Sequence, residues 1–147
     1  MNKFYIAVLV GLLSSGCAEY LPISSGALKG VVASIPQQWE GVADDKIVQF
    51  ETQAGEAYSV NLWVVEVSGF LHVFAGDNRA NWVEDIEQNA NVRLRAGNEI
   101  YELEAQRVSD ADVFERFAQA WEAKYGSRPR NENVAETYLY RLQARRA

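Results

Sequence analysis

The run YSVNLWVVEVSGFLHVFA, residues 58–75, carries the clearest structural signal in the chain. From Tyr58 to Val67 the side chains alternate with the period of two that is typical of a β-strand. Ser68 and Gly69 then supply a tight turn into a second apolar strand at 70–75, so the run predicts a β-hairpin. Both faces of this hairpin are largely apolar, which suits a sheet that closes on itself or is covered by helices.

Further strands and two helices are predicted around this hairpin. Together with 58–67 and 70–75, strands at 47–52, 91–96, 99–108 and 137–142 bring the count to six, and residues 28–33 are a further candidate strand. A first helix is predicted at 79–88, capped by Asp77 or Asn78. A second follows an N-cap in 109–112, runs to Tyr125 and stops at Gly126. The pattern indicates an α+β fold with a mostly antiparallel, barrel-like sheet.

Composition excludes several classes of protein. The chain has 147 residues, 14 Lys plus Arg, 20 Asp plus Glu and a formal charge of −6, which fits one acidic domain with no general attraction to nucleic acid. A single Cys excludes a disulfide framework and Cys-based metal sites. The single His, His72, lies in a predicted strand and is interpreted as a structural residue. We therefore expect neither a nucleic-acid partner nor a bound metal.

The first seventeen residues predict an export signal. Lys3 precedes an apolar core at 4–13 and small residues at 14–16, so 1–16 is typical of a signal peptide and too short to span a membrane comfortably. The small residues before Cys17 resemble the lipobox of bacterial lipoproteins, which implies acylation of the Cys17 thiol and cleavage in front of it. The alternative is ordinary secretion with a chance cysteine, but a free thiol would be a liability in an oxidising compartment.

These features predict the domain organisation and the location. Residues 1–16 form the signal peptide, 17–30 the lipidated N-terminus and a tether rich in small residues, and 31–147 the folded domain. The acidic domain would be repelled by anionic headgroups, so the lipid would hold it at the membrane. Ala18 after the cysteine, by resemblance to enterobacterial sorting rules, points to the outer membrane on its periplasmic side within the bacterial envelope.

Three short runs suggest a family. FAGDNRANW at 74–82, NANVRL at 89–94 and YLYRL at 138–142 follow one another in an order and spacing that resemble the split β-barrel flavin-binding proteins. These include the pyridoxamine 5′-phosphate oxidase-like proteins and the deazaflavin-dependent nitroreductase-like proteins. The likeness covers about 48–145. It implies a split β-barrel, a homodimer, and FMN or a related flavin in a groove between subunits.

The resemblance also implies where the cofactor would bind. Its phosphate would be held at the turn after Thr52 and at the start of the helix near Asn78 and Arg79, where free N–H groups and one Arg suit an anion. Asn61 could line the groove or a dimer contact. Trp82 could stack on the ring, although an aromatic residue on a helix more often packs in the core. Catalytic residues are not assigned.

The turn at 53–58 departs from the family pattern. Relatives carry a basic Gly-Arg-Lys-Ser-Gly-like stretch, whereas this chain has no cation there and carries Glu56, so a phosphate would need Arg79, Arg93 or Arg95 to compensate. Two hypotheses therefore stand. The first is a lipid-anchored FMN-dependent oxidoreductase acting on a small molecule, and the second is a cofactor-free binding or scaffolding lipoprotein on the same fold. We also predict that Arg93 and Arg95 pair with Glu102 and Glu104 across neighbouring strands.

Overall fold

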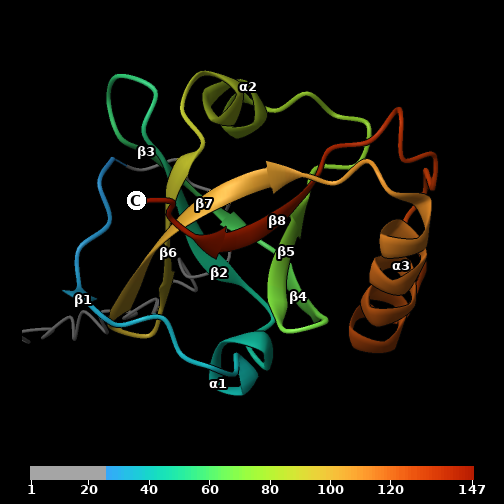
Figure 1. Cartoon of the computed structure of the whole chain (residues 1–147), viewed down its shortest axis with the longest axis horizontal. Helices are drawn as coiled ribbons and strands as arrows, with labels where there is room; N and C mark the ends of the chain where they lie inside the picture. Colours follow the sequence, from blue (N-terminus) through green and yellow to red (C-terminus); the bar gives the residue numbers. More distant parts are fainter. Residues whose placement is uncertain (1–25) are drawn as a thin grey trace, which may run out of the picture.

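The computed structural model describes residues 26–147 (Figure 1). The predicted signal peptide, the lipidation site Cys17 and residues 18–25 of the predicted tether lie outside this range. Within it, no helix has the length and apolar character needed to cross a membrane.

The predicted α+β, mostly antiparallel barrel fold is confirmed, with more elements than expected. The structure has eight strands in place of six and three helices in place of two within the described residues. In chain order they are β1 (Val31–Val32), α1 (Glu40–Ala43), β2 (Val48–Thr52), β3 (Tyr58–Leu62), β4 (Val64–Val67), β5 (Phe70–Phe74), α2 (Asn81–Gln88), β6 (Asn91–Ala96), β7 (Glu99–Arg107), α3 (Ala111–Tyr125) and β8 (Leu139–Ala144).

The sheet curls so that the consecutive strands β3 and β4 lie on opposite edges. Its order is β3-β2-β6-β7-β8-β5-β4, with all these pairs antiparallel and β1 added in parallel to the start of β7. The prediction of one strand over 58–67 is therefore wrong. The strand is interrupted at Trp63, because the residues before Trp63 pair with β2 while those after it pair with β5. This change of partner curls the sheet into a half-barrel.

Helix α2 begins two residues later than predicted. Ala80 is its N-cap and makes no side-chain cap hydrogen bond, so Asp77 and Asn78 do not cap it. The reason is a tight turn after β5, in which the Asn78 N–H donates to the Ala75 carbonyl at 3.2 Å. Helix α3 follows the prediction: the Asp110 carboxylate accepts from the N–H groups of Asp112 and Val113, and Gly126 ends the helix at a φ of 87°.

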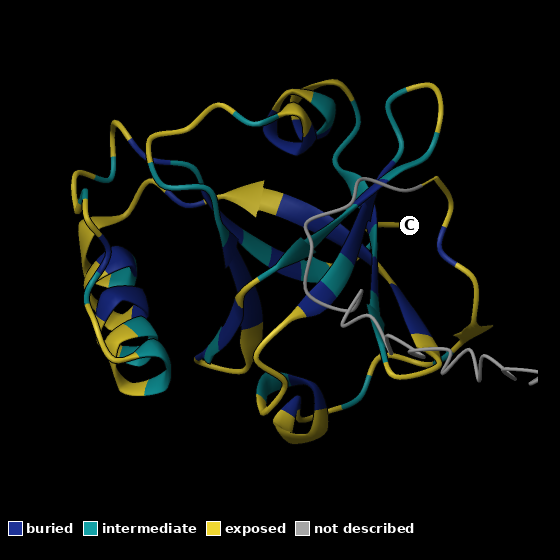
Figure 2. Cartoon of the chain, turned by 180° about the vertical axis from the view of Figure 1, so that it is seen from behind, coloured by how far each residue is buried: buried dark blue, intermediate teal, exposed yellow. Residues whose placement is uncertain are grey.

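Two hydrophobic layers hold the fold together (Figure 2). The barrel interior contains Phe50, Leu94, Leu103 and Leu142, and α2 adds Trp82, Val83 and Ile86 to it. Trp82 makes edge-to-face contacts with Phe50 and Tyr140, at ring-centre distances of 5.6 and 5.9 Å. The second layer packs Phe114, Phe117 and Ala118 of α3 on Val65, Val67 and Leu139 from the outer face of the sheet. The two layers account for the largely apolar faces of the β4–β5 hairpin.

Residues 26–33, which we call the docking segment, are fastened to the sheet. The Leu28 N–H donates to the Glu51 carboxylate at 2.6 Å, and the Ser59 hydroxyl donates to the Gly26 carbonyl at 2.8 Å. The Val31 N–H then donates to the Asn98 carbonyl at 2.8 Å. The described end of the predicted tether is thus in contact with β2 and β3 before β1 begins.

The cross-strand charge pairs differ from those predicted. Arg93 pairs with buried Glu51 at 3.5 Å, and Arg95 donates to Gln49 at 3.2 Å. Glu102 pairs with Arg145 and Glu104 with Arg146, at 3.6 and 2.8 Å. The prediction failed because β6 has two neighbours, and its arginines reach toward β2 while the chain end supplies cations to β7.

Candidate ligand-binding groove

Thr52 lies where the family resemblance placed one half of a phosphate site. Its side chain is fully buried at the end of β2, and its hydroxyl donates to the Asp85 carboxylate of α2 at 2.6 Å. An adjoining cavity of about 340 Å³ is lined by Glu56, Glu84 and Asp85 together with Ala54, Ala57, Tyr58 and Asn81. The turn at 53–57 and the start of α2 therefore enclose an acidic space, which we call the acidic cavity.

Arg79 lies on the exposed loop before α2 and already has two acidic partners. Its guanidinium forms a hydrogen-bonded ion pair with Glu87 and approaches Glu84 at 4.0 Å. The hydrogen bond from Arg79 to Glu87 raises the pKa of the guanidinium further above its usual range. Asn78 is exposed beside it, whereas Trp82 is in the core and Asn61 lies partly buried on β3. The five predicted cofactor residues do not line one common cavity.

A flavin phosphate does not fit this region. Three carboxylates line the acidic cavity without a cation, and the hydroxyl that could donate to a phosphate is engaged by Asp85. A dianion placed there would be repelled at close range and would lose more hydration than these side chains replace. The arrangement instead joins β2 to α2 through a partly buried hydrogen bond.

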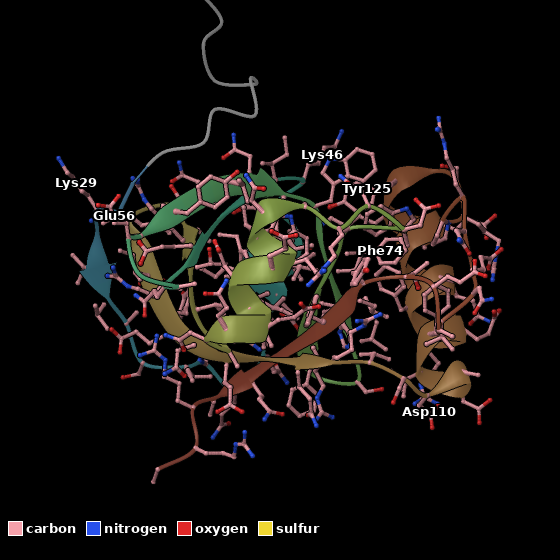
Figure 3. All side chains as sticks on the ribbon, turned by 90° about the horizontal axis from the view of Figure 1, so that it is seen from above. Lys29, Lys46, Glu56, Phe74, Asp110 and Tyr125 are labelled. Carbon is pink, nitrogen blue, oxygen red and sulfur yellow. The ribbon has the colours of Figure 1, made fainter. Side chains whose placement is uncertain are left out.

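A larger and chemically different groove opens beside α3. It has a volume of about 490 Å³ and is lined by residues from the β3–β4 break, the end of β5, helix α3 and the loop that follows it. We call it the aromatic groove. Its lining residues are Trp63, Phe74, Ala75, Gly76, Asp77, Trp121, Ser127, Arg128, Pro129, Arg130 and Asn131. Phe74 and Tyr125 lie toward this side of the molecule in Figure 3.

Stacked rings form one wall of the aromatic groove. Trp63 is 46% exposed and stacks on Tyr125, with ring centres 4.2 Å apart and planes 11° apart. Trp121 lies 5.2 Å from the Trp63 ring and 5.7 Å from the Phe74 ring. These contacts leave large apolar ring surfaces beside solvent, which is the lining that planar aromatic ligands favour.

The last two residues of α3 fix this wall in place. The Tyr125 hydroxyl accepts from the Val64 N–H at 3.0 Å and donates to the Lys46 carbonyl at 2.8 Å. Burial raises the pKa of this phenol. The Lys124 ammonium donates to the Ala43 and Val64 carbonyls at 2.7 and 2.6 Å. These bonds tie the end of α3 to Val64, which follows Trp63, and to the segment before β2, so the ring that stacks on Trp63 is held in place.

The positive charges of the aromatic groove lie in the loop after α3. Arg128 is held by Glu115 at 2.8 Å and by Glu132. Arg130 is exposed and makes no ion pair with any residue of 26–147. Its guanidinium is thus available to an anionic group of a ligand, next to the amide of Asn131.

Local sequence patterns do not predict this groove. Trp63 lies within the predicted strand 58–67 and Trp121 within the predicted helix that ends at Tyr125. Nothing local connects the strand with a helix end about sixty positions later. Two Arg in a loop directly after an aromatic helix face were the available signal.

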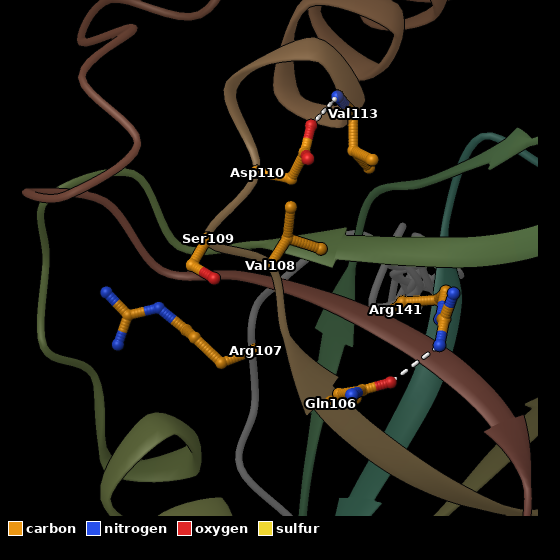
Figure 4. Close-up of a pocket in the computed structure, with 7 residues that line it drawn as sticks. All are labelled: Gln106, Arg107, Val108, Ser109, Asp110, Val113 and Arg141. Carbon is orange, nitrogen blue, oxygen red and sulfur yellow. Dashed lines mark hydrogen bonds between the residues drawn. The ribbon is translucent and has the colours of Figure 1, made fainter.

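A third cavity, beside β7 and α3, is unsuited to a ligand (Figure 4). It measures about 170 Å³ and includes Arg107, Ser109 and Arg141 in its lining. Arg141 donates to Gln106 at 2.6 Å, and the Arg107 guanidinium lies 4.4 Å above the centre of the Tyr138 ring. These cations are directed to partners within the protein.

Solved structures of low sequence identity share the fold of this chain. No family model and no curated protein sequence matches the chain. A protein described as a candidate pyridoxamine 5′-phosphate oxidase from Listeria innocua superposes with a TM-score of 0.57 at 10% identity, covering 73% of this chain and 90% of that one. An F420-H2 dependent reductase superposes with a TM-score of 0.52 at 18% identity, over 67% and 94%. A third structure, described as a domain-swapped dimer, gives 0.52 at 16% identity, over 71% and 89%.

The chain therefore has the split-barrel fold of pyridoxamine 5′-phosphate oxidase-like and F420-dependent proteins. This agrees with the resemblance inferred from residues 74–94 and 138–142.

Proposed function

We propose that the chain is a lipid-anchored protein of the bacterial cell envelope, on the periplasmic side of the outer membrane, that binds a planar aromatic ligand carrying an anionic group. The observation that carries this proposal is the aromatic groove, in which an exposed Trp63 supported by Tyr125 lies with Trp121 and with Arg130, which has no ion-pair partner within 26–147. Stacking would hold the ring, and the guanidinium would select a carboxylate, sulfonate or phosphate.

Two versions of this function follow from the two hypotheses. A cofactor-free binding protein is favoured by the acidic cavity, because the family's phosphate position carries three carboxylates here. An FMN-dependent oxidoreductase acting on a small molecule is supported by the fold alone; if it is correct, the flavin would supply the redox chemistry. A homodimer is expected in either case, in line with the domain-swapped dimer among the similar folds.

Ligand binding can be tested on the mature chain with Cys17 replaced by Ser. FMN, riboflavin and 8-anilinonaphthalene-1-sulfonate are added separately, and tryptophan fluorescence is followed. Saturable quenching by an anionic aromatic probe is expected, since Trp63 and Trp121 line the aromatic groove. Arg130→Ala should weaken the anionic probe about tenfold, which corresponds to losing one charge-assisted hydrogen bond, and should leave riboflavin unchanged.

Arg116→Ala is the matched control, because Arg116 is exposed on α3 and lies outside the aromatic groove. Equal affinities of the Arg130 and Arg116 variants, or quenching that does not saturate with any of the three probes, would contradict the proposed site. A yellow protein on purification would favour the oxidoreductase. Colourless protein that takes up no added FMN would favour the cofactor-free form.

Attachment to the membrane is tested separately by Cys17→Ala in the full-length precursor. The acyl chains are the expected source of stable binding, since the acidic domain is repelled by anionic lipid. The variant should move from the membrane fraction to the soluble fraction of the envelope. Retention in the membrane fraction would show that the anchor is not Cys17.

A further inference from the structure

We infer that the end of the barrel at β1 rests on the membrane surface, with Val31, Val32 and Ile35 in contact with the lipid. This inference rests on the proposed acylation of Cys17. The partner of this surface is a lipid bilayer, and the β1 end is the side of the domain that faces it.

The docking segment limits how far the domain can move from its anchor. Gly26 and Leu28 are bonded to Ser59 and Glu51, so the described chain is already fastened to the sheet at Gly26, ahead of β1. Only eight residues, 18–25, lie between Cys17 and Gly26. Even a fully extended chain of this length spans at most about 30 Å, which is close to the diameter of a small domain. Gly26 therefore stays within about 30 Å of the acylated cysteine, which keeps this side of the domain in reach of the lipid.

Exposed aliphatic side chains follow directly after the fastened residues. Val31, Val32 and Ile35 are 62%, 55% and 41% exposed, which accounts for half of the large hydrophobic residues exposed within 26–147. The backbone of residues 31–33 is held by the bonds of the Val31 N–H to the Asn98 carbonyl and of the Ala33 N–H to the Ile100 carbonyl, at 2.8 and 2.9 Å. Apolar side chains on a rigid strand next to a lipid anchor are suited to enter the headgroup boundary.

The contact between these three side chains and the bilayer can form even if it is too weak to bring the unanchored protein to a membrane. The short connection to Cys17 keeps the surface at a high effective concentration near the bilayer. Charge adds little attraction, because Lys29 is the exposed cation of the docking segment while Glu99 is exposed opposite Val31 in the β1–β7 ladder. We therefore expect the contact to form on zwitterionic lipid and to weaken on anionic lipid.

This orientation leaves the aromatic groove open. Figure 1 places β1 and α3 at opposite ends of the long axis, and Figure 3 shows Lys29 and Glu56 at one end with Asp110 and Tyr125 toward the other. A bilayer at the β1 end thus faces away from Trp121 and Arg130. A ligand could enter the groove from the aqueous side without passing the membrane.

The test makes the lipid attachment chemically, so it does not depend on acylation in the cell. The mature chain contains a single thiol, Cys17, which is coupled to maleimide-bearing phosphatidylethanolamine in phosphatidylcholine vesicles. Amide hydrogen exchange is then compared between coupled protein and free protein mixed with plain vesicles. Exchange at 31–35 should slow by about threefold or more on coupling, while exchange in the 127–131 loop should stay unchanged. Replacing half of the lipid by phosphatidylglycerol should reduce the protection.

Val31→Ser with Val32→Ser should abolish the protection, whereas Phe70→Ser, which removes an exposed ring on the distant β4–β5 hairpin, should leave it intact. Exchange at Ala33 in the free double variant shows whether β1 has loosened; if it has, Ile35→Ser alone replaces the double variant. Equal exchange at 31–35 in coupled and free wild-type protein would overturn the inference, as would protection centred on 127–131. A Cys17→Ala protein that stays membrane-bound would contradict the anchor and leaves the vesicle result to stand on its own.

Discussion

Glu51→Ala is expected to lower the free energy of unfolding by about 4 kcal/mol, the range found when one partner of a buried ion pair is removed. The Glu51 side chain is 1% exposed and accepts from the Leu28 N–H at 2.6 Å and from Gln53 at 3.0 Å. Without it, Arg93 keeps a charge in a largely buried position, and its Nε already lacks a partner among residues 26–147. The docking segment would also lose one of the bonds that hold it to β2.

Urea unfolding followed by circular dichroism measures this effect. Glu102→Ala is the control, because Glu102 is half-exposed and its pair with Arg145 at 3.6 Å belongs to the class of surface pairs worth less than about 1 kcal/mol. Glu51→Gln should fall between the two, since it keeps hydrogen-bond acceptors but loses the charge. Equal losses for Glu51→Ala and Glu102→Ala would show that the buried carboxylate is not a fastening point.

Acidification below pH 6.5 is expected to destabilise the protein through His72. This residue is 1% exposed beneath α3, its Nδ1 hydrogen-bonds to the Phe70 carbonyl at 2.9 Å, and its Nε2 has no partner among the described residues. Burial lowers the pKa of His72 from 6.5 to about 4, with a smaller lowering by nearby Arg141. Between these two pH values His72 is protonated in the unfolded chain but stays neutral in the folded chain. Stability from this group is therefore complete above pH 6.5 and falls by roughly 3 kcal/mol as the pH drops to 4.

The contribution of His72 is separated from that of the carboxylates by substitution. His72→Leu keeps a side chain of similar size between Val65 and Arg141 in the ladder and removes the titrating group. Wild type and variant are unfolded in urea at pH 7.5 and at pH 4, and the two losses are compared. The wild type should lose roughly 3 kcal/mol more than the variant. Parallel losses would mean that the imidazole is protonated inside the folded protein at little cost.

Local signals predicted the parts of the fold that local interactions determine. Helix α3 was found from its apolar spacing and both ends, because Asp110 and Gly126 act within one turn of the residues that they cap. The β6–β7 hairpin was likewise visible in the alternation on either side of Gly97. Strand β1 and helix α1 were missed or only suggested, since two and four residues are too short to show a period.

Features that depend on distant partners were not predictable from the same patterns. The break at Trp63 is held by the hydroxyl of Tyr125, which bonds to Val64 across 61 positions. Thr52 and Arg79 were chosen as anion-binding residues from their places beside a turn and a helix. Their partners Asp85 and Glu87 are themselves on that helix, and only the folded arrangement shows that they engage the Thr52 hydroxyl and the Arg79 guanidinium.

The break at Trp63 also determines how the barrel can open. Strands β3 and β4 are the two outer edges of the sheet, yet Leu62 and Val64 are separated in the chain by Trp63 alone. The seam between these edges is therefore closed by a covalent link at one point. If the seam widened, the two edges would separate about Trp63, the one residue that joins them. The residue whose indole lines the aromatic groove is thus the same residue that connects the two edge strands.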